Sequence, residues 1–381
     1  MDSHNDAPMM LAGLQYRANA AVIWLNSTNS SSGTIGLDSC NRTLYHGEHE
    51  SAESQKSRWV EIICYPMVLM LCTTGNVLIF AVLCGSRPRT TADIYMMALA
   101  VTDALVMWIR MPLWILLVSP NLSKTDPTFA YNTTVYSGIY IWLSMTLYAL
   151  SDGIVLTFAI ERILLTVNPM SPKGHLQPRT AVKIIAAIFA FGLLLFTATG
   201  VDYFARLAAG QDIASWDETM RPKWLADWVA IQTGVVVALV FVAFVATPSA
   251  NLILTAWLVK RRLNRSRDLG RNASAEQLFR SGTRIAFACA CLFTVCQTPA
   301  IVFLGLTIAD RAPFCSIHFT ANARFTLGEV VWLCASLYYT MNFYMYLAIS
   351  HKFRKQLLER FPIFSRLACA TTPGTAECPN K

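Results

Sequence analysis

The sequence predicts an all-α membrane protein, a bundle of seven transmembrane helices followed by a short amphipathic cytosolic helix. Of its 381 residues, 54% are hydrophobic and only 14% are charged, whereas a soluble domain carries about 25% charged residues. Long windows without Asp, Glu, Lys or Arg recur along the chain, and about 20 apolar residues are enough to cross a bilayer as a helix. The charge-free windows are 62–86, 127–151, 184–201, 228–259, 285–309 and 330–351, and a further apolar stretch at 95–118 is interrupted only by Asp103 and Arg110.

These windows divide the chain into four regions. Residues 1–58 are polar and rich in Ser and Asn without a sustained apolar core, which predicts a flexible, glycosylated extracellular segment and no cleaved signal peptide. Residues 59–348 hold the bundle, 349–361 form the amphipathic helix on the membrane surface, and 362–381 are a cytosolic tail. The predicted spans are 59–84, 92–118, 134–166, 181–201, 227–259, 283–308 and 326–348.

Basic residues gather on one side of the predicted membrane, so the net charge of +8 indicates orientation rather than nucleic-acid binding. The links after spans one, three and five and the tail are basic, whereas the opposite loops are mixed or acidic. The N-terminus is therefore expected outside and the C-terminus in the cytosol, in the plasma membrane. Five glycosylation sequons fall on the expected outside, at Asn26, Asn29, Asn41, Asn121 and Asn132, and two others, at Asn264 and Asn272, fall inside and should stay bare.

The polar residues within the spans narrow the function. No internal repeat and no HExxH, GxSxG, Walker A or paired CxxC motif is present, so an enzyme is not expected. A receptor, a transporter and a structural membrane protein remain. Asn76, Asp103, Ser151 and Asn342 come from four spans at similar depth, as a bundle with an internal polar core requires.

The motifs resemble those of rhodopsin-type (class A) G-protein-coupled receptors over residues of about 59 to 361. In chain order they are Gly75-Asn76, Leu99-Ala100-x-x-Asp103, Glu161-Arg162, Pro248, Phe293-x-x-Cys296-x-x-Pro299, Asn342-Phe343-x-x-Tyr346 and the amphipathic run 351–357. The resemblance implies that Glu161 holds Arg162 at rest, and that Arg162 is released on activation to open a cleft for a heterotrimeric G protein. The alternative is an ordinary solvated ion pair at a helix end. The other residues implied in the coupling switch are Asn342, Tyr346, Pro248, Phe293 and Pro299.

The resemblance also implies an internal polar site at Asn76, Asp103, Ser151 and Asp152, with Asp103 as a candidate site for a sodium ion. Asp152 is unusual, because related receptors have an apolar residue at that position. We expect a neutral Asp152 hydrogen-bonded to a neighbouring helix, although a cation shared with Asp103 and Ser151 is the alternative. No other cofactor or metal is expected.

The family's usual disulfide at the top of span three cannot form, because its position is Ser137 and the outer loop at 202–226 has no cysteine. Cys40 and Cys315 are the two cysteines expected outside, so a Cys40–Cys315 disulfide is predicted. Free thiols or intermolecular links are the alternatives. Span six also departs from the family pattern, because Gln297 stands where a Trp is usual, and span seven has Phe343 in place of the usual Pro.

The ligand is expected to be a peptide that contacts Arg110, Gln297, Glu329 and Trp332. The forked donors of Arg110 suit a carboxylate or a peptide carbonyl, and Glu329 suits a basic side chain. Alternatively, Arg110 and Glu329 pair with each other or with loops, and Trp332 serves in packing. The run from Asn342 to Leu357 and the Cys296-Gln297-Thr298-Pro299 motif resemble invertebrate neuropeptide receptors, including the FMRFamide-receptor group. A chemosensory receptor for a small environmental molecule is the alternative, with a transporter third.

The end of the chain is predicted to contact lipid. Basic and apolar residues alternate at helical spacing from His351 to Arg360, which suits the anionic inner leaflet. Cys369 follows within reach of the membrane and is a candidate for palmitoylation, with an unmodified thiol as the alternative.

Overall fold

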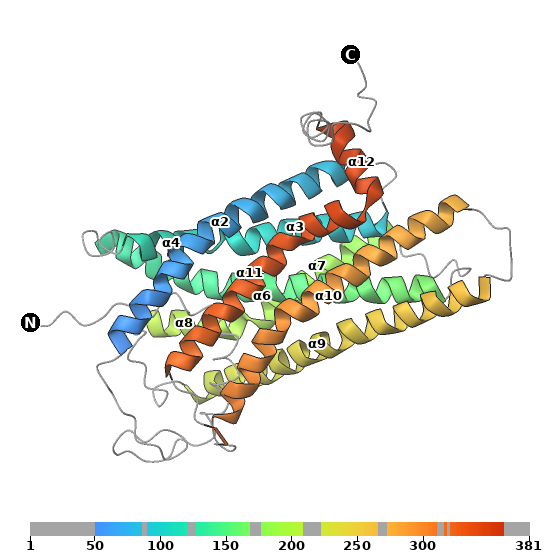
Figure 1. The fold of residues 1–381 in the computed structure, drawn as a ribbon. Helices are drawn as coiled ribbons and strands as arrows, with labels where there is room; N and C mark the ends of the chain where they lie inside the picture. Colours follow the sequence, from blue (N-terminus) through green and yellow to red (C-terminus); the bar gives the residue numbers. More distant parts are fainter. Residues whose placement is uncertain are drawn as a thin grey trace, which may run out of the picture.

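The computed structural model describes residues 50–85, 90–119, 127–167, 177–208, 222–265, 273–310, 316–317 and 321–361, and within these ranges it contains helices and no strands. Figure 1 shows long, roughly antiparallel helices in one bundle, with the short helix α12 at one end. The helices are α2 (Glu50–Cys84), α3 (Thr91–Trp108), α4 (Met111–Val118), α6 (Pro127–Val167), α7 (Pro178–Leu195), α8 (Thr197–Ala208), α9 (Lys223–Arg265), α10 (Ala273–Ala309), α11 (Ala321–Ile349) and α12 (His351–Arg360).

Six segments of the described chain are long and apolar enough to cross a membrane: 61–84, 91–118, 131–164, 178–208, 223–254 and 291–309. They correspond to the first six predicted spans. The predicted seventh span is α11, which is a continuous helix of 29 residues but is not among these six apolar segments. Four tyrosines and Asn342 lower its hydropathy, and most of these side chains face the bundle rather than its surface.

Helix α6 forms the centre of the bundle and α11 closes it. α6 packs against α3, α7, α8, α9 and α10, and 61% of its spanning window is buried, compared with 17% for α9. α11 lies between α2 and α10, so the last long helix returns beside the first (Figure 1). The peripheral helices expose Leu, Ile, Val and Phe side chains in large numbers, as expected for surfaces that face lipid.

The second span bends between α3 and α4, just before Pro112. Proline has no N–H and disrupts the helix that precedes it, so the amides of Leu113 and Trp114 both donate to the Arg110 carbonyl, at 3.1 Å. The Ile109 carbonyl thereby loses its helical partner and accepts from the Tyr136 hydroxyl at 2.5 Å. The Tyr65 hydroxyl donates to the nearby Met107 carbonyl at 2.7 Å. Two tyrosines from other helices therefore stabilise the bend that carries Arg110.

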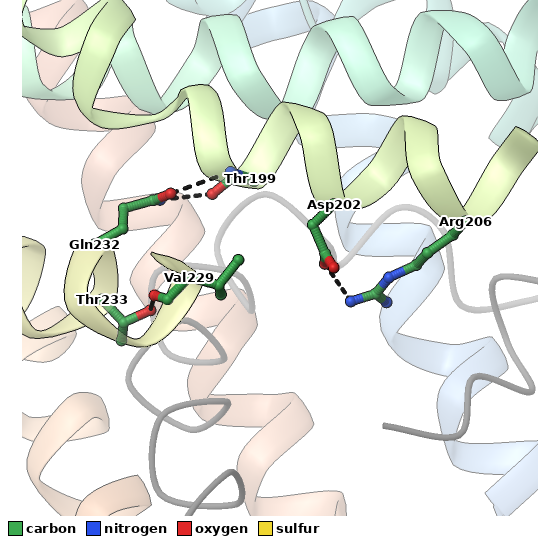
Figure 2. Close-up of polar contacts among 6 residues, drawn as sticks. All are labelled: Thr199, Asp202, Arg206, Val229, Gln232 and Thr233. Carbon is green, nitrogen blue, oxygen red and sulfur yellow. Dashed lines mark hydrogen bonds and ion pairs between the residues drawn. The ribbon is translucent and has the colours of Figure 1, made fainter. Parts of the chain in front are cut away.

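The fourth span is interrupted in a similar way at Phe196, between α7 and α8. The first amides of a helix have no carbonyl partner within it, and here Gln232 of α9 supplies one (Figure 2). Its Oε1 accepts from the Thr199 backbone amide at 3.1 Å, and its Nε2 donates to the Thr199 hydroxyl at 2.6 Å. Lipid offers no hydrogen bonds to the free backbone amide of Thr199. The Gln232 side chain supplies the missing acceptor and thereby joins α8 to α9.

The fourth span extends further than the sequence predicted. We expected Asp202 in an outer loop beginning at 202, but α8 continues to Ala208 and Asp202 is 2% exposed. It forms an ion pair with Arg206 one turn later (Figure 2). The sequence suggested a loop because charges begin at Asp202, whereas the helix tolerates them by pairing them at i and i+4.

Helix α12 presents its apolar face to the bundle. Phe353 and Leu357 are each 4% exposed, and the Phe353 ring lies 6.1 Å from that of Phe343 and 6.3 Å from that of Tyr346. Ser350 caps the first turn by accepting from the Phe353 amide at 3.1 Å. Arg354, Lys355 and Arg360 are exposed. Contact between these basic residues and anionic lipid stays a prediction.

Candidate functional site

Polar side chains occur at three levels along the bundle. We call the end that holds Glu61, Arg110 and Glu329 the Arg110 half, and the end that holds Glu161, Arg162 and α12 the Arg162 half. Asp103 and its partners lie between the two halves. Each level brings together residues from at least two helices.

In the Arg110 half, the residue expected to bind ligand is itself bound by the protein. Arg110 donates to Glu61 of α2 in a close ion pair, and the two residues are only 8% and 5% exposed. The Arg110 guanidinium also lies 4.8 Å from the centroid of the Trp332 ring, in cation–π geometry. Neither partner was identified from the sequence, where we considered a pair with Glu329 or with a loop.

Glu61 was missed because it lies near the start of the predicted first span, 59–84, just outside the charge-free window, and no role was assigned to it. It is the residue immediately before the charge-free window 62–86, and a charge at the edge of a span usually marks where water begins. Arg110 lies well inside the second span, so it requires a carboxylate at matching depth on a neighbouring helix. That requirement is the signal that could have pointed to Glu61.

Glu329, the other charged candidate, lies on α11 one turn before Trp332. It interacts electrostatically with both Arg110 and Glu61, but it makes no ion pair with a described residue. Its Oε2 atom is buried and accepts no hydrogen bond from the described part of the chain. Trp332 is 5% exposed. The predicted ligand contacts Arg110, Glu329 and Trp332 are therefore neighbours in space.

At the middle level, Asp103 is completely buried and each of its carboxylate oxygens accepts a hydrogen bond. The Ser151 hydroxyl donates to Oδ1 at 3.1 Å, and the Asn342 amide donates to Oδ2 at 2.6 Å. Asn76 belongs to a separate contact, donating to the Tyr339 carbonyl at 3.3 Å and to Cys72 Sγ at 3.1 Å. Asp103, Ser151 and Asn342 thus form a cluster, the Asp103 cluster, that joins α3, α6 and α11.

Asp152 contacts Gln297 of α10, and it also interacts electrostatically with Asp103. Its Oδ1 accepts from Gln297 Nε2 at 3.5 Å, which is long for a hydrogen bond. Gln297 is 7% exposed. Of the two expectations for Asp152, this geometry matches the carboxyl bonded to a neighbouring helix. It also links Gln297, the unusual residue of span six, to the unusual residue of span three.

In the Arg162 half, Glu161 and Arg162 form a buried pair. Arg162 Nη2 lies 3.9 Å from Glu161 Oε2, and the residues are 7% and 1% exposed. Glu161 Oε1 also accepts a short hydrogen bond from the Thr91 hydroxyl, in the first turn of α3. A helix N-terminus favours an anion, so α3 helps to hold Glu161. The pair is not the solvated ion pair that we considered as the alternative.

Arg162 has further interactions with its surroundings. Its guanidinium lies 5.0 Å from the Phe158 ring centroid, and Asp93 and Tyr95 of α3 interact with it electrostatically. Thr91 and Asp93 were not singled out from the sequence. Both belong to the start of α3, where Thr90 and Asp93 form a capping box, so their pattern indicated a helix start and gave no sign of contact with Arg162.

The remaining predicted switch residues lie on the helices expected. Pro248 and Pro299 are within α9 and α10, and Phe293 is buried edge-to-face against Tyr338 at 5.9 Å. Tyr346 packs on Phe353. Phe343, which takes the place of the family's proline, lies against Gly75, where a Cβ would be 2.8 Å from Phe343 Cβ. Gly75 therefore lets α2 and α11 approach closely.

The region where the usual disulfide is missing is held by packing. Ser137 donates to the Thr133 carbonyl of its own helix at 2.9 Å. Next to it, Gly138 leaves room for the Tyr203 ring of α8, which a Cβ would overlap. The Tyr203 hydroxyl donates to the Thr134 carbonyl at 2.7 Å. One aromatic side chain thus connects α6 and α8.

Most predicted modification sites lie outside the described residues. These are Cys40, Cys315, Cys369, Asn26, Asn29, Asn41 and Asn121. Asn132 is described, and it is exposed near the start of α6. The disulfide, the glycans and the palmitate stay predictions.

Comparison with known proteins gives a consistent family. Residues 75–338 match the model of the 7 transmembrane receptor (rhodopsin family). The chain is 24% identical over 287 residues to neuromedin-U receptor 2 of Rattus norvegicus, covering 71% of this chain and 69% of that receptor. It is 25% identical to C5a anaphylatoxin chemotactic receptor 1 of Danio rerio, covering 79% and 80%.

A third similarity is shorter. The cholecystokinin receptor type A of Oryctolagus cuniculus is 27% identical over 167 residues, 43% of this chain and 36% of that receptor. None of these three is an FMRFamide receptor, so that finer resemblance stays a prediction. The family match covers well over half of the chain, and it agrees with the helical bundle and the ordered motifs. This chain therefore belongs to the rhodopsin family of seven-transmembrane receptors and is a receptor, not an enzyme.

Proposed function

We propose that this receptor lies in the plasma membrane with its N-terminus outside, binds an extracellular peptide in the Arg110 half, and activates a heterotrimeric G protein from the Arg162 half. The similar receptors are named for neuromedin-U, C5a and cholecystokinin, and these names support a peptide over a small environmental molecule. The observation that carries the coupling step is the buried Glu161–Arg162 pair.

The pair suits a switch because separating it is costly unless a new partner is supplied. Removing one partner of a buried ion pair leaves an uncompensated charge, so the resting arrangement persists until another group takes up Arg162. In the proposed active arrangement, Glu161 keeps the hydrogen bond that it accepts here from Thr91. The two arrangements can therefore differ by a modest free energy, as a two-state element requires.

The Asp103 cluster lies between the two ends and is suited to transmit the change. Asp103 ties α3 to α6 and α11 through Ser151 and Asn342. A sodium ion at Asp103 is part of the proposal. Ser151 and the carboxylate would hold it, and buried side-chain oxygens of Asn76 and Asn342 that accept no hydrogen bond from described residues are suitable further ligands. The ion would neutralise Asp103.

The test is to express the receptor in cells, apply an amidated-peptide library, and record calcium and cyclic-AMP responses. We expect a peptide response that Arg162→Ala abolishes at unchanged surface expression. Lys183→Ala is the matched control, because Lys183 is exposed on α7, and it should respond as the native receptor does. Responses only to volatiles or metabolites would favour chemosensation, and solute uptake without a G-protein signal would indicate a transporter.

The orientation can be tested in the same cells. An epitope placed before Met1 should be labelled by antibody without permeabilisation, and enzymatic removal of glycans should change the mobility of the protein on a gel. The proposal fails if the epitope is reached only after permeabilisation, or if sugar is attached at Asn264 or Asn272.

A further inference from the structure

The charges of the Arg110 half nearly all have partners. The side chains of this half that are not exposed include three ion pairs: Glu61–Arg110, Asp202–Arg206, and Asp310–Arg324, the last at 2.7 Å between Oδ2 and Nη2. Each pair is neutral in sum. Glu329 is the described carboxylate of this half that remains without an ion-pair partner and is partly buried.

Arg110 is not available to compensate Glu329 or to bind an acidic ligand. It is already bonded to Glu61, covered by the Trp332 ring and 8% exposed. A ligand carboxylate would have to displace Glu61 from a low-dielectric site, leaving that residue as an uncompensated charge. Arg110 is therefore suited to position Trp332 and Glu61. Its contact with the ligand stays a prediction.

Glu329 completes a group of two carboxylates and one guanidinium, with a net charge of −1. The Glu329 Oε2 atom has no donor in the described part of the chain, and a buried acceptor without a donor is unfavourable by itself. The group lacks one cation. A metal ion is a poor candidate, since no cluster of three or more His, Cys, Asp or Glu occurs among the described residues. An organic cation needs fewer ligands and benefits from an aromatic neighbour such as Trp332.

We propose that Glu329 is the subsite for a cationic group of the ligand, the guanidinium or ammonium of a basic residue. This inference rests on the proposed function, because it identifies a chemical feature of the peptide that activates the receptor. The incoming cation supplies the donor that Oε2 lacks and brings the group to neutrality. Arg110 and Glu61 keep the carboxylate and the Trp332 ring in place.

The experiment uses two amidated-peptide libraries that are identical except that every Arg in the first is citrulline, its neutral isostere, in the second. Both are screened on the native receptor and on Glu329→Gln. For an active Arg peptide we expect the citrulline form to be about tenfold to a hundredfold weaker on the native receptor, as for loss of a charge-assisted hydrogen bond. On Glu329→Gln the two forms should be equally weak.

The control is Glu359→Gln, since Glu359 is an exposed carboxylate on α12, and it should keep the native preference for Arg. The subsite is overturned if Arg and citrulline peptides act equally on the native receptor. It is also overturned if Glu329→Gln keeps the preference, or if a peptide with Glu in place of Arg is preferred and Arg110→Met abolishes its action. If neither library activates the native receptor, the peptide assignment itself fails and the subsite with it.

Discussion

Asp103 and Glu329 are both carboxylates inside the helix bundle, but their surroundings differ. Asp103 is completely buried and accepts one hydrogen bond on each oxygen, from Ser151 and from Asn342. Glu329 is less deeply buried, yet its Oε2 atom accepts no hydrogen bond from the residues that the structure describes. The more deeply buried carboxylate is thus the one that the protein satisfies.

This difference separates two uses of a buried charge. Donors from α6 and α11 make Asp103 a connection between helices, so its contribution is to the bundle itself. At Glu329 the protein supplies a carboxylate and places a guanidinium nearby, but commits that guanidinium to Glu61. An unsatisfied group in an otherwise paired region is a cost to the folded chain, and such a cost is expected where a ligand later provides the missing partner.

The largest effect is expected when Arg110, the ion-pair partner of Glu61, is removed. Arg110→Met leaves Glu61 as a buried carboxylate without its ion-pair partner, which should destabilise the receptor by about 3–5 kcal/mol. The melting temperature of the purified receptor in detergent and its surface expression should both fall. The double variant Glu61→Gln with Arg110→Met should recover part of the loss. If the double variant is less stable than Arg110→Met alone, Glu61 is not the partner that matters.

A smaller loss is expected at the satisfied carboxylate. Asp103→Ala leaves the Ser151 hydroxyl and the Asn342 amide without their acceptor, at a cost of about 1–3 kcal/mol. The loss is limited because the Ser151 hydroxyl can donate instead to a carbonyl of its own helix. Thermal melting of the purified protein measures this loss. Asp103→Asn preserves the shape and should cost less than Asp103→Ala. Equal stability of native protein and Asp103→Ala would show that these hydrogen bonds do not hold the helices together.

The smallest effect, and one of opposite sign, is expected at the unsatisfied carboxylate. Without ligand, Glu329→Gln removes a charge that lacks a donor, so stability should stay the same or rise by up to about 1 kcal/mol. The same melting assay detects this change, and adding an activating Arg peptide should then stabilise native receptor more than Glu329→Gln. A marked loss of stability in Glu329→Gln would mean that this carboxylate is satisfied after all, and the comparison with Asp103 would fail.

Much of the fold was predictable because lipid imposes simple rules on sequence. Apolar windows marked the seven predicted spans, and the first six spans are recovered as apolar helices, with α11 as the seventh helix. Errors occurred where charge was used as a boundary. Asp202 proved to be helical and buried, because Arg206 one turn later neutralises it. Glu61 lay just outside the charge-free window 62–86 and was given no role, although it pairs with Arg110 inside the bundle.

The bends within the second and fourth spans also depend on residues distant in sequence. Pro112 accounts for the first bend, but Tyr65 and Tyr136, whose hydroxyls donate to carbonyls at the bend, come from α2 and α6. Nothing near Phe196 indicated that Gln232, more than thirty residues later, would satisfy the second (Figure 2). A single sequence shows which backbone groups a bend releases but not which helix will lie beside them.

The sequence by itself determined the helical class, the approximate spans, the family motifs and the set of polar residues within the bundle, because each follows from local composition and spacing. The tertiary structure alone decided how those polar residues combine: Arg110 with Glu61, Asp152 with Gln297, Glu161 with Thr91, and Glu329 with no donor for its Oε2 among the described residues. The physical reason is that pairing depends on the rotation and bending of helices about their axes, and these are set by packing between segments far apart in the chain.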